Sequence, residues 1–246
     1  MFSNRSSISR GSALAIAALA AVACLGMADL ASASVIDNFA TNDSSNYNYF
    51  VAYNPNNNNP TPDTFAVSTY NGNPDFLPNM RLNEADIWLY NGGQTLNVGG
   101  TLSVEFLAGT SNQNGQVGLV ISPQINSTNN GATFGVQDIS GTYTLLVGAN
   151  SLTLSGTQTG LSTMTVTEPT ADTYDVTVSG GGLTTGSLSV TTTYSTANFG
   201  LWQFSNALAA GQPEENLTLV TPEPATLVLV AVGGLGLLLL KRRKTV

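Results

Sequence analysis

Alternation of apolar and polar residues is the feature that most limits how this chain can fold. In residues 102–106, 117–121 and 143–147, every second residue is a large apolar or aromatic one. Successive side chains of a strand point to opposite faces, so this period of two predicts strands with one buried and one solvated face. No stretch of the body has the 3.6-residue period of an amphipathic helix.

The clearest predicted unit is a β-hairpin. Residues 164–166 and 174–178 alternate in the same way, and the turn-rich sequence EPTAD at 168–172 connects them. Further strands are predicted at 188–194, 199–204 and 217–219, with a short one at 49–53 inside the Asn-rich loop 42–60. Many short strands without helices to cover a parallel sheet predict an all-β fold, an antiparallel β-sandwich of the jelly-roll type.

The ends of the body carry a resemblance at the level of the fold. The sequence VIDNF at 35–39 opens the body, and FGLWQFSN at 199–206 followed by ENLTLV at 215–220 closes it. This arrangement is similar to the concanavalin-like and laminin-G-like jelly rolls of extracellular proteins. The resemblance implies that the closing strand pairs near the opening one.

The N-terminal segment 1–33 is predicted to be a secretory signal peptide. Arg5 and Arg10 precede an apolar stretch at 13–27, and Ala31 and Ala33 are small residues at the two positions that a signal peptidase reads. We expect cleavage after Ala33. Two alternatives remain open: a retained transmembrane helix, and a lipoprotein modified at Cys24.

The C-terminal segment 221–246 has three parts in order. Pro222, Glu223 and Pro224 precede an apolar run at 225–240, and a basic cluster of Lys241, Arg242, Arg243 and Lys244 follows. The run has 16 residues and would be about 24 Å long as a helix, which is short for a bilayer core of about 30 Å but sufficient with its flanks at the interfaces. We therefore predict one transmembrane helix with the basic cluster on the cytoplasmic side and the body outside the inner membrane.

These three parts resemble the PEP-CTERM sorting signal of exopolysaccharide-producing Gram-negative bacteria. The resemblance implies that an exosortase recognises Pro222-Glu223-Pro224, cleaves nearby, and sends the body to the cell surface or the extracellular matrix. The processing partners would be signal peptidase and exosortase, and the hold on the inner membrane would be transient. The alternative is a permanent C-terminal anchor that is never cut.

The charge of the body, residues 34–220, excludes several functions. The body has thirteen carboxylates and a single cation, Arg81, a net charge of −12. Nucleic acid is therefore excluded as a partner. The chain has no His, and its one Cys is Cys24, so the body lacks the residues of histidine-dependent triads, cysteine nucleophiles, zinc sites and disulfides.

Carboxylate chemistry remains, and Glu84 and Asp86 are its best candidates. They would share one strand face with Trp88, which could stack on a sugar, and carboxylates two residues apart lie about 7 Å from each other. The stretch partly resembles the active strand of jelly-roll glucanases, although the second Glu of that pattern is absent. A glycan hydrolase is therefore the alternative function, and an ordinary strand with a polar, solvated side is the simpler interpretation.

Two kinds of binding site are also expected. Asp37, Asn38 and Asp43 could supply oxygen ligands to calcium, against the alternative of solvated acids; no other cofactor is indicated. The aromatic residues that could contact a glycan, with neighbouring Asn side chains as hydrogen-bonding partners, are Tyr47, Tyr49, Tyr53, Trp88, Tyr90 and Trp202, and the candidate contacts among them are Tyr47, Tyr49, Tyr53 and Trp88. The competing interpretation is that these aromatics form the core, as Trp202 and Phe204 on one strand face would. The sequence favours an exported, non-catalytic structural or adhesive protein that binds exopolysaccharide.

Overall fold

The computed structural model describes residues 32–53, 65–78, 80, 84–108, 115–124, 131–193, 196–205 and 213–221. They belong to a compact unit that runs from Ala33 to Thr221. Within these residues no helix is long and apolar enough to cross a membrane. Residues 1–31 of the predicted signal peptide 1–33, the Pro-Glu-Pro motif, the predicted transmembrane helix and the basic cluster lie outside the described residues, whereas Ser32 and Ala33 begin β1.

Two β-sheets form the unit, which we call sheet A and sheet B. Sheet A has the order β14 (Leu183–Thr191), β13 (Thr173–Gly180), β12 (Ser162–Thr170), β7 (Thr101–Phe106), β16 (Glu214–Thr221), β4 (Asn73–Phe76), β3 (Val67–Tyr70), and β1 (Ser32–Asp37) also pairs with β16. Sheet B has the order β11 (Asn150–Leu154), β10 (Thr142–Val147), β9 (Ala132–Ile139), β8 (Gln116–Ser122), β15 (Thr196–Ser205), β5 (Glu84–Tyr90), β2 (Tyr47–Tyr53), and β6 (Leu96–Asn97) pairs with β15.

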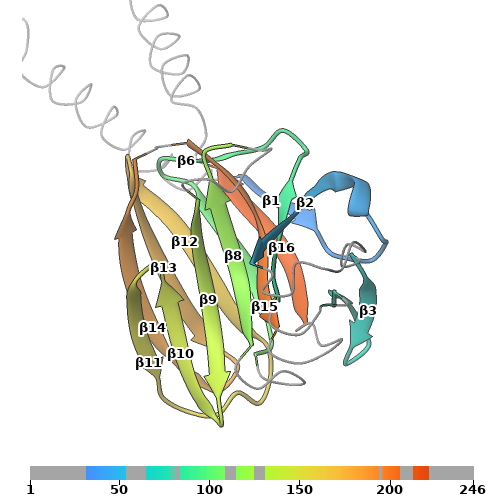
Figure 1. Ribbon diagram of the computed structural model, residues 1–246, viewed down its shortest axis with the longest axis vertical. Coiled ribbons are helices and arrows are strands. Elements are labelled where there is room, and N and C mark those ends of the chain that lie inside the picture. The colour runs from blue at the N-terminus through green and yellow to red at the C-terminus, as the bar shows by residue number, and fades with distance from the viewer. Residues whose placement is uncertain are drawn as a thin grey trace, which may run out of the picture. The chain divides into compact units, whose positions relative to one another are not determined.

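The two sheets pack face to face. Strands β8 to β11 of sheet B lie in front of β12 to β14 of sheet A in Figure 1. The ladders along both sheets are antiparallel. A single short 3-10 turn, η1 (Ser44–Asn46), is the helical structure among the described residues. The prediction of an all-β antiparallel sandwich is confirmed.

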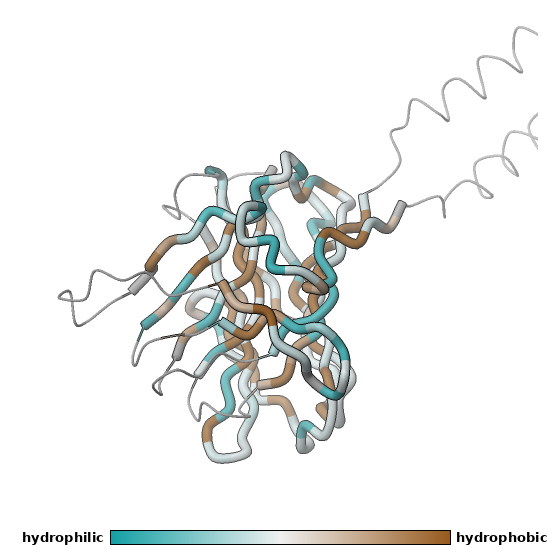
Figure 2. The backbone as a smooth tube through the Cα atoms, turned by 90° about the vertical axis from the view of Figure 1, so that its right-hand side faces the viewer, coloured by the Kyte–Doolittle hydropathy of each residue, from teal (hydrophilic) through white to brown (hydrophobic). Residues whose placement is uncertain are grey.

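The core lies between the sheets and follows the alternation in the sequence. Strands β7, β12 and β13 each bury every second residue, and hydrophobic and hydrophilic residues alternate along the strands in Figure 2. The inward side chains include Val104, Met164 and Val176 from sheet A and Leu119 and Leu201 from sheet B, all fully buried. Burial of such side chains is the main favourable contribution to the fold.

The predicted strands correspond to observed ones, with changes at their ends. The predicted hairpin is β12 and β13, but β12 continues to Thr170, so the turn is only Ala171 and Asp172. Asp172 has a φ of 65°, a left-handed conformation that Asp tolerates better than most residues. The short strand predicted near Tyr49 is the seven-residue β2, and the closing strand β16 pairs with the opening strand β1.

Strand β5 departs from the alternation because both of its faces are covered. Trp88 points into the main core between the sheets. Ile87 and Leu89 point outward and are buried with Val120 in a second, smaller cluster, packed against Phe50 and Trp202. The inner face of β5 therefore includes Glu84 and Asp86, two and four residues before Trp88.

Candidate functional site

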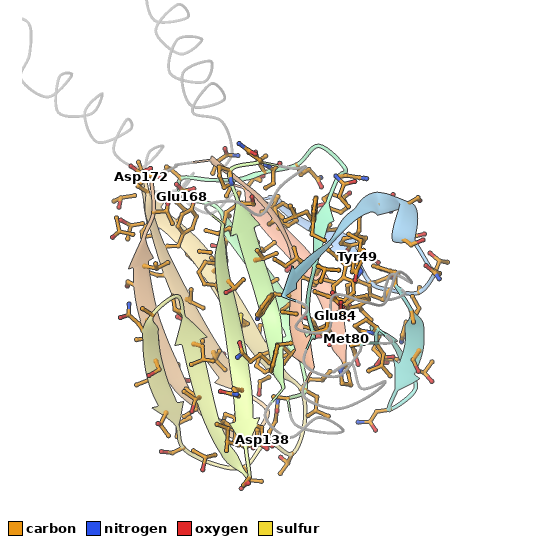
Figure 3. All side chains as sticks on the ribbon, viewed as in Figure 1. Tyr49, Met80, Glu84, Asp138, Glu168 and Asp172 are labelled. Atoms are coloured by element: carbon orange, nitrogen blue, oxygen red, sulfur yellow. The ribbon has the colours of Figure 1, made fainter. Side chains whose placement is uncertain are left out.

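A layer of polar side chains lies inside the sandwich, next to the apolar core. Glu84 and Asp86 on β5 are 1 % and 0 % exposed. The hydroxyl of Tyr49 on β2 donates a hydrogen bond of 2.9 Å to Oδ1 of Asp86. Gln203 on β15 is the register partner of Asp86. Figure 3 labels Tyr49 and Glu84 in this part of the unit.

Glu214 extends this layer to the other sheet. It begins β16 in sheet A, and its Oε2 accepts a hydrogen bond of 2.9 Å from Nε2 of Gln203 in sheet B. Burial raises the pKa of Glu214 well above its ordinary value, although the amide of Gln203 and the backbone N–H of Gly118 lower it. We define Glu84, Asp86, Gln203 and Glu214 as the buried polar layer. Burial disfavours the charged form of this carboxyl, because a buried charge is costly even when it accepts hydrogen bonds.

Burial decides what this layer can do chemically. Glu84 and Asp86 share one strand face with Trp88, as expected from the alternation, but that face is the interior and not the solvated side. A hydrolase needs both carboxyl groups at an accessible cleft with room for a sugar. At 1 % exposure or less, neither group reaches a ligand outside the sandwich in this structure.

The residues proposed for calcium are engaged with the protein itself. Asp37 is buried; its Oδ1 accepts from the backbone N–H of Phe39 at 2.7 Å and its Oδ2 from the hydroxyl of Tyr47 at 3.0 Å. Oδ1 of Asn38 accepts from the backbone N–H of Ala40, and Asp43 precedes η1. Burial raises the pKa of Asp37, and the nearby charge of Asp43 adds to the shift. The described residues contain no cluster of three metal-ligating side chains.

The aromatic residues expected to contact glycans lie mostly inside. Tyr47 is 6 % exposed and Trp88 is 1 % exposed, and both belong to the main core. Tyr49 is half-buried, with its ring 5.6 Å from that of Trp88 and its hydroxyl held by Asp86. Tyr53 ends β2, and its side chain lies outside the described residues. Tyr47 and Trp88 therefore have no face to offer a ligand at the surface.

A surface that the sequence did not single out lies on the outer face of sheet B. It consists of the side chains that alternate with core residues along β2, β5, β15, β8, β9, β10 and β11, from Asn48 to Thr153, and we call it the neutral face. Its described side chains are Asn, Gln, Ser, Thr, aliphatic or aromatic, with no charged residue among them. In a body with thirteen carboxylates, this is an uneven distribution of charge.

Trp202 is the largest side chain on the neutral face and is partly exposed. The register partner of Trp202 on β8 is Gly118, and the register partner of Gly118 on β9 is Gly135. A Cβ built on Gly135 would lie only 3.2 Å from Nε1 of Trp202. The indole therefore extends from β15 over β8 to β9, across a part of the sheet where the two glycines have no side chains.

The outer face of sheet A is different. Ser and Thr side chains form hydrogen-bonded pairs across its strands, for example Ser103 with Thr218 at 2.6 Å. Carboxylates are interspersed with them, including Glu105, which accepts from the amide of Asn216, and Asp175. The outer face of sheet A therefore carries charged side chains, whereas the neutral face of sheet B carries none among its described residues.

Two further acids lie at one end of the unit. Glu168 at the end of β12 is fully buried, and Asp172 lies in the following turn; Figure 3 shows both at the end opposite to Asp138. Burial raises the pKa of Glu168 to about 7, and the charge of Asp172 adds to the shift, while the backbone N–H of Asp172 and the hydroxyl of Tyr174 lower it. No sequence signal separated Glu168 from an ordinary turn residue.

Comparison with known proteins identifies one sequence motif. Residues 220–244 match the PEP-CTERM protein-sorting motif. The match begins at Val220, the next-to-last residue of β16. No curated protein matches the chain.

Solved structures resemble the body only distantly. A protein of unknown function from Shewanella oneidensis MR-1 is 11% identical, with a TM-score of 0.43, 89% of this chain and 95% of that chain being covered. A lectin from Bauhinia forficata in complex with GalNAc is 10% identical, with a TM-score of 0.46 and coverage of 77% and 97%. The CBM2 module of the evolved Dit of Lactobacillus casei BL23 phage J-1 is 9% identical, with a TM-score of 0.47 and coverage of 79% and 99%. At these scores the likeness carries no information on function.

Proposed function

We propose that this chain is an exported, exosortase-processed protein of the cell surface or the exopolysaccharide matrix. The observation that carries the proposal is the PEP-CTERM sorting motif at 220–244. That motif implies a secreted protein with exosortase as its processing partner. Signal peptidase would remove residues 1–33, and the inner membrane would hold the precursor only until cleavage near Pro222-Glu223-Pro224.

The position of the motif in the chain supports this order of events. Strand β16 is a central strand of sheet A, paired with β7 and β4, and it ends at Thr221, one residue before Pro222. Cleavage after this strand removes none of the residues that form it. The body therefore keeps its two sheets when the C-terminal segment is lost.

We further propose that the body has a structural or adhesive role, without catalysis, and binds polysaccharide of the matrix. The carboxyl groups that were candidates for hydrolysis are enclosed in the buried polar layer. The neutral face instead offers amides, hydroxyls and a partly exposed indole, the groups by which proteins bind sugars.

Mass spectrometry of the protein from its native cell tests the sorting proposal. We expect a mature chain that begins near Ser34 and lacks peptides from 227–241. Retention of those peptides on the mature chain would establish a permanent anchor instead. Deletion of Pro222-Glu223-Pro224 is the matched control, and it should leave the uncut precursor in the inner membrane.

A pull-down with polysaccharide from the same cells tests the adhesive role. The full chain should be retained by the polysaccharide and released by the soluble form of the same polymer. Absence of retention would contradict the binding part of the proposal and leave the sorting part standing.

A further inference from the structure

We infer that the neutral face is the polysaccharide site, that Trp202 is its stacking residue, and that its ligand is an uncharged polysaccharide chain. The inference rests on the proposed function, since it names the surface and the ligand class for the same adhesive role. It starts from the residues in one row across sheet B: Phe50, Ile87, Trp202, Gly118 and Gly135.

The indole of Trp202 reaches across the sheet from β15 to β9. Trp202 packs against the cluster of Ile87, Leu89 and Val120, of which Ile87 is 2 % exposed. On the other side Gly118 and Gly135 leave the backbone bare, and the indole N–H edge reaches Gly135. Part of the Trp202 side chain remains exposed in this position. An outward aromatic face is the surface on which a pyranose ring stacks.

The hydrogen bonding of Trp202 indicates that the fold alone does not explain this residue. Its Nε1 is buried and has no acceptor among the described residues. An unsatisfied buried N–H destabilises a protein, and a Phe or Leu at this position would fill the space without that cost. Among the described residues nothing pairs with this N–H, so the hydrogen bonding of the fold gives no reason for an indole here. Stacking on a ligand is a physical reason for it.

Polar groups flank the stacking position on both neighbouring rows. Gln116 and Gln137 are register partners on one side, and Thr133 faces Val120 on the other. All three polar side chains are half-buried, so part of each is open to solvent. Neighbouring strands lie about 4.8 Å apart, close to the length of one sugar unit, so a chain running across the strands could place successive hydroxyls near these groups.

Charge decides between neutral and acidic polysaccharides. An acidic polymer would meet a body of net charge −12 with no cation on the neutral face to pair with its carboxylates or sulfates. A neutral polymer meets neither repulsion nor an unpaired charge. The outer face of sheet A, with Glu105 and Asp175, has no comparable aromatic residue among its described side chains.

Fluorescence quenching tests the inference on the unmodified full chain. The chain has two Trp residues, and Trp88 is 1 % exposed, so acrylamide quenches mainly Trp202. Cellohexaose, laminarihexaose and xylohexaose serve as neutral probes, and an alginate hexamer as the acidic one. We expect at least one neutral probe to lower the quenching constant about twofold, and the alginate hexamer to leave it unchanged.

Variants then separate stacking from folding. Trp202→Ala should weaken binding of that neutral probe at least tenfold, equivalent to about 1.4 kcal/mol, while Trp202→Phe should retain most of it. Thr165→Ala on the outer face of sheet A is the matched control and should bind like the wild type. Melting temperatures of all variants show whether each folds, and the quenching result on the unmodified chain does not depend on them.

Three results would overturn the inference. In the first, neutral probes bind but leave the quenching of Trp202 unchanged, and they bind Trp202→Ala as tightly as the wild type. The site would then lie elsewhere, and the proposed function would stand. Protection by the alginate hexamer alone would give the opposite ligand class. Binding of neither the probes nor the native polysaccharide would refute the inference together with the adhesive role.

Discussion

Glu168 provides the sharpest test of the electrostatics of the fold, through the substitution Glu168→Gln. Burial raises the pKa of this carboxyl from 4.5 to about 7 in the folded chain, and the charge of Asp172 adds to the shift. The folded state therefore holds a proton that the unfolded state releases. Between pH 4.5 and about 7 the folded state binds more protons, so the free energy of unfolding falls as the pH rises through this window.

The size of the effect follows from that difference in pKa. At 1.36 kcal/mol for each pH unit, the window of about 2.5 units corresponds to at most about 3.4 kcal/mol. Glu168 lies at the end of a strand, where the adjoining turn can relax and admit water, so we expect about 1–2 kcal/mol. The neutral amide of Glu168→Gln does not titrate. The variant should therefore be more stable than the wild type by about that amount at pH 8, and about equally stable at pH 4.

Urea unfolding of both chains at pH 4, 5.5, 7 and 8 measures this difference. Asp172→Asn is the matched control, because Asn also tolerates the left-handed conformation that Asp172 adopts at a φ of 65°. It removes the charge that raises the pKa of Glu168, so the wild-type loss of stability should become smaller. A difference between Glu168→Gln and the wild type that is the same at pH 4 and pH 8 would refute the reasoning.

Two further predictions concern the interior. Tyr49→Phe removes the hydrogen bond to buried Asp86 and should lower the free energy of unfolding by about 1–3 kcal/mol without changing binding of matrix polysaccharide; unchanged stability in urea would contradict the bond. Gly200→Ala would drive a Cβ into backbone atoms of β5 and should cost more than about 3 kcal/mol, whereas Gly160→Ala, where nothing lies within 4 Å, should change the melting temperature little.

The fold was largely predictable because period-two alternation reports directly on which residues are buried. The hairpin at β12 and β13 and the strands β7, β8 and β10 follow from it. The orientation of β5 did not, because alternation alone cannot say which face of a strand is inside. Glu84 and Asp86 share a face with Trp88, and a polar pair normally marks the solvated side.

The candidate binding surface was less predictable than the fold. Trp202 and Phe204 alternate with core residues on β15, and from the sequence this looked like packing. The surroundings of Trp202 include Gly118 and Gly135, which become its neighbours only because β15 pairs with β8, a strand far from it in the chain, and β8 pairs with β9. The exposed part of an aromatic residue is a property of those pairings, and no local pattern contains it.

The distribution of acids in the body has a consequence for the whole protein. Burial raises the pKa of five carboxyl groups: Asp37, Asp75, Glu168, Glu214 and Glu215. The described residues include no Lys or Arg that could lower these pKa values by pairing. Each group then destabilises the folded state as the pH rises from the value at which the unfolded carboxyl ionises, and repulsion among the thirteen carboxylates acts in the same direction. The melting temperature of the body should therefore be higher near pH 5 than at pH 8. A protein stabilised by ionised carboxylates in salt bridges would show the reverse. A melting temperature that rises from pH 5 to pH 8 would show that these carboxyl groups are ionised in the fold.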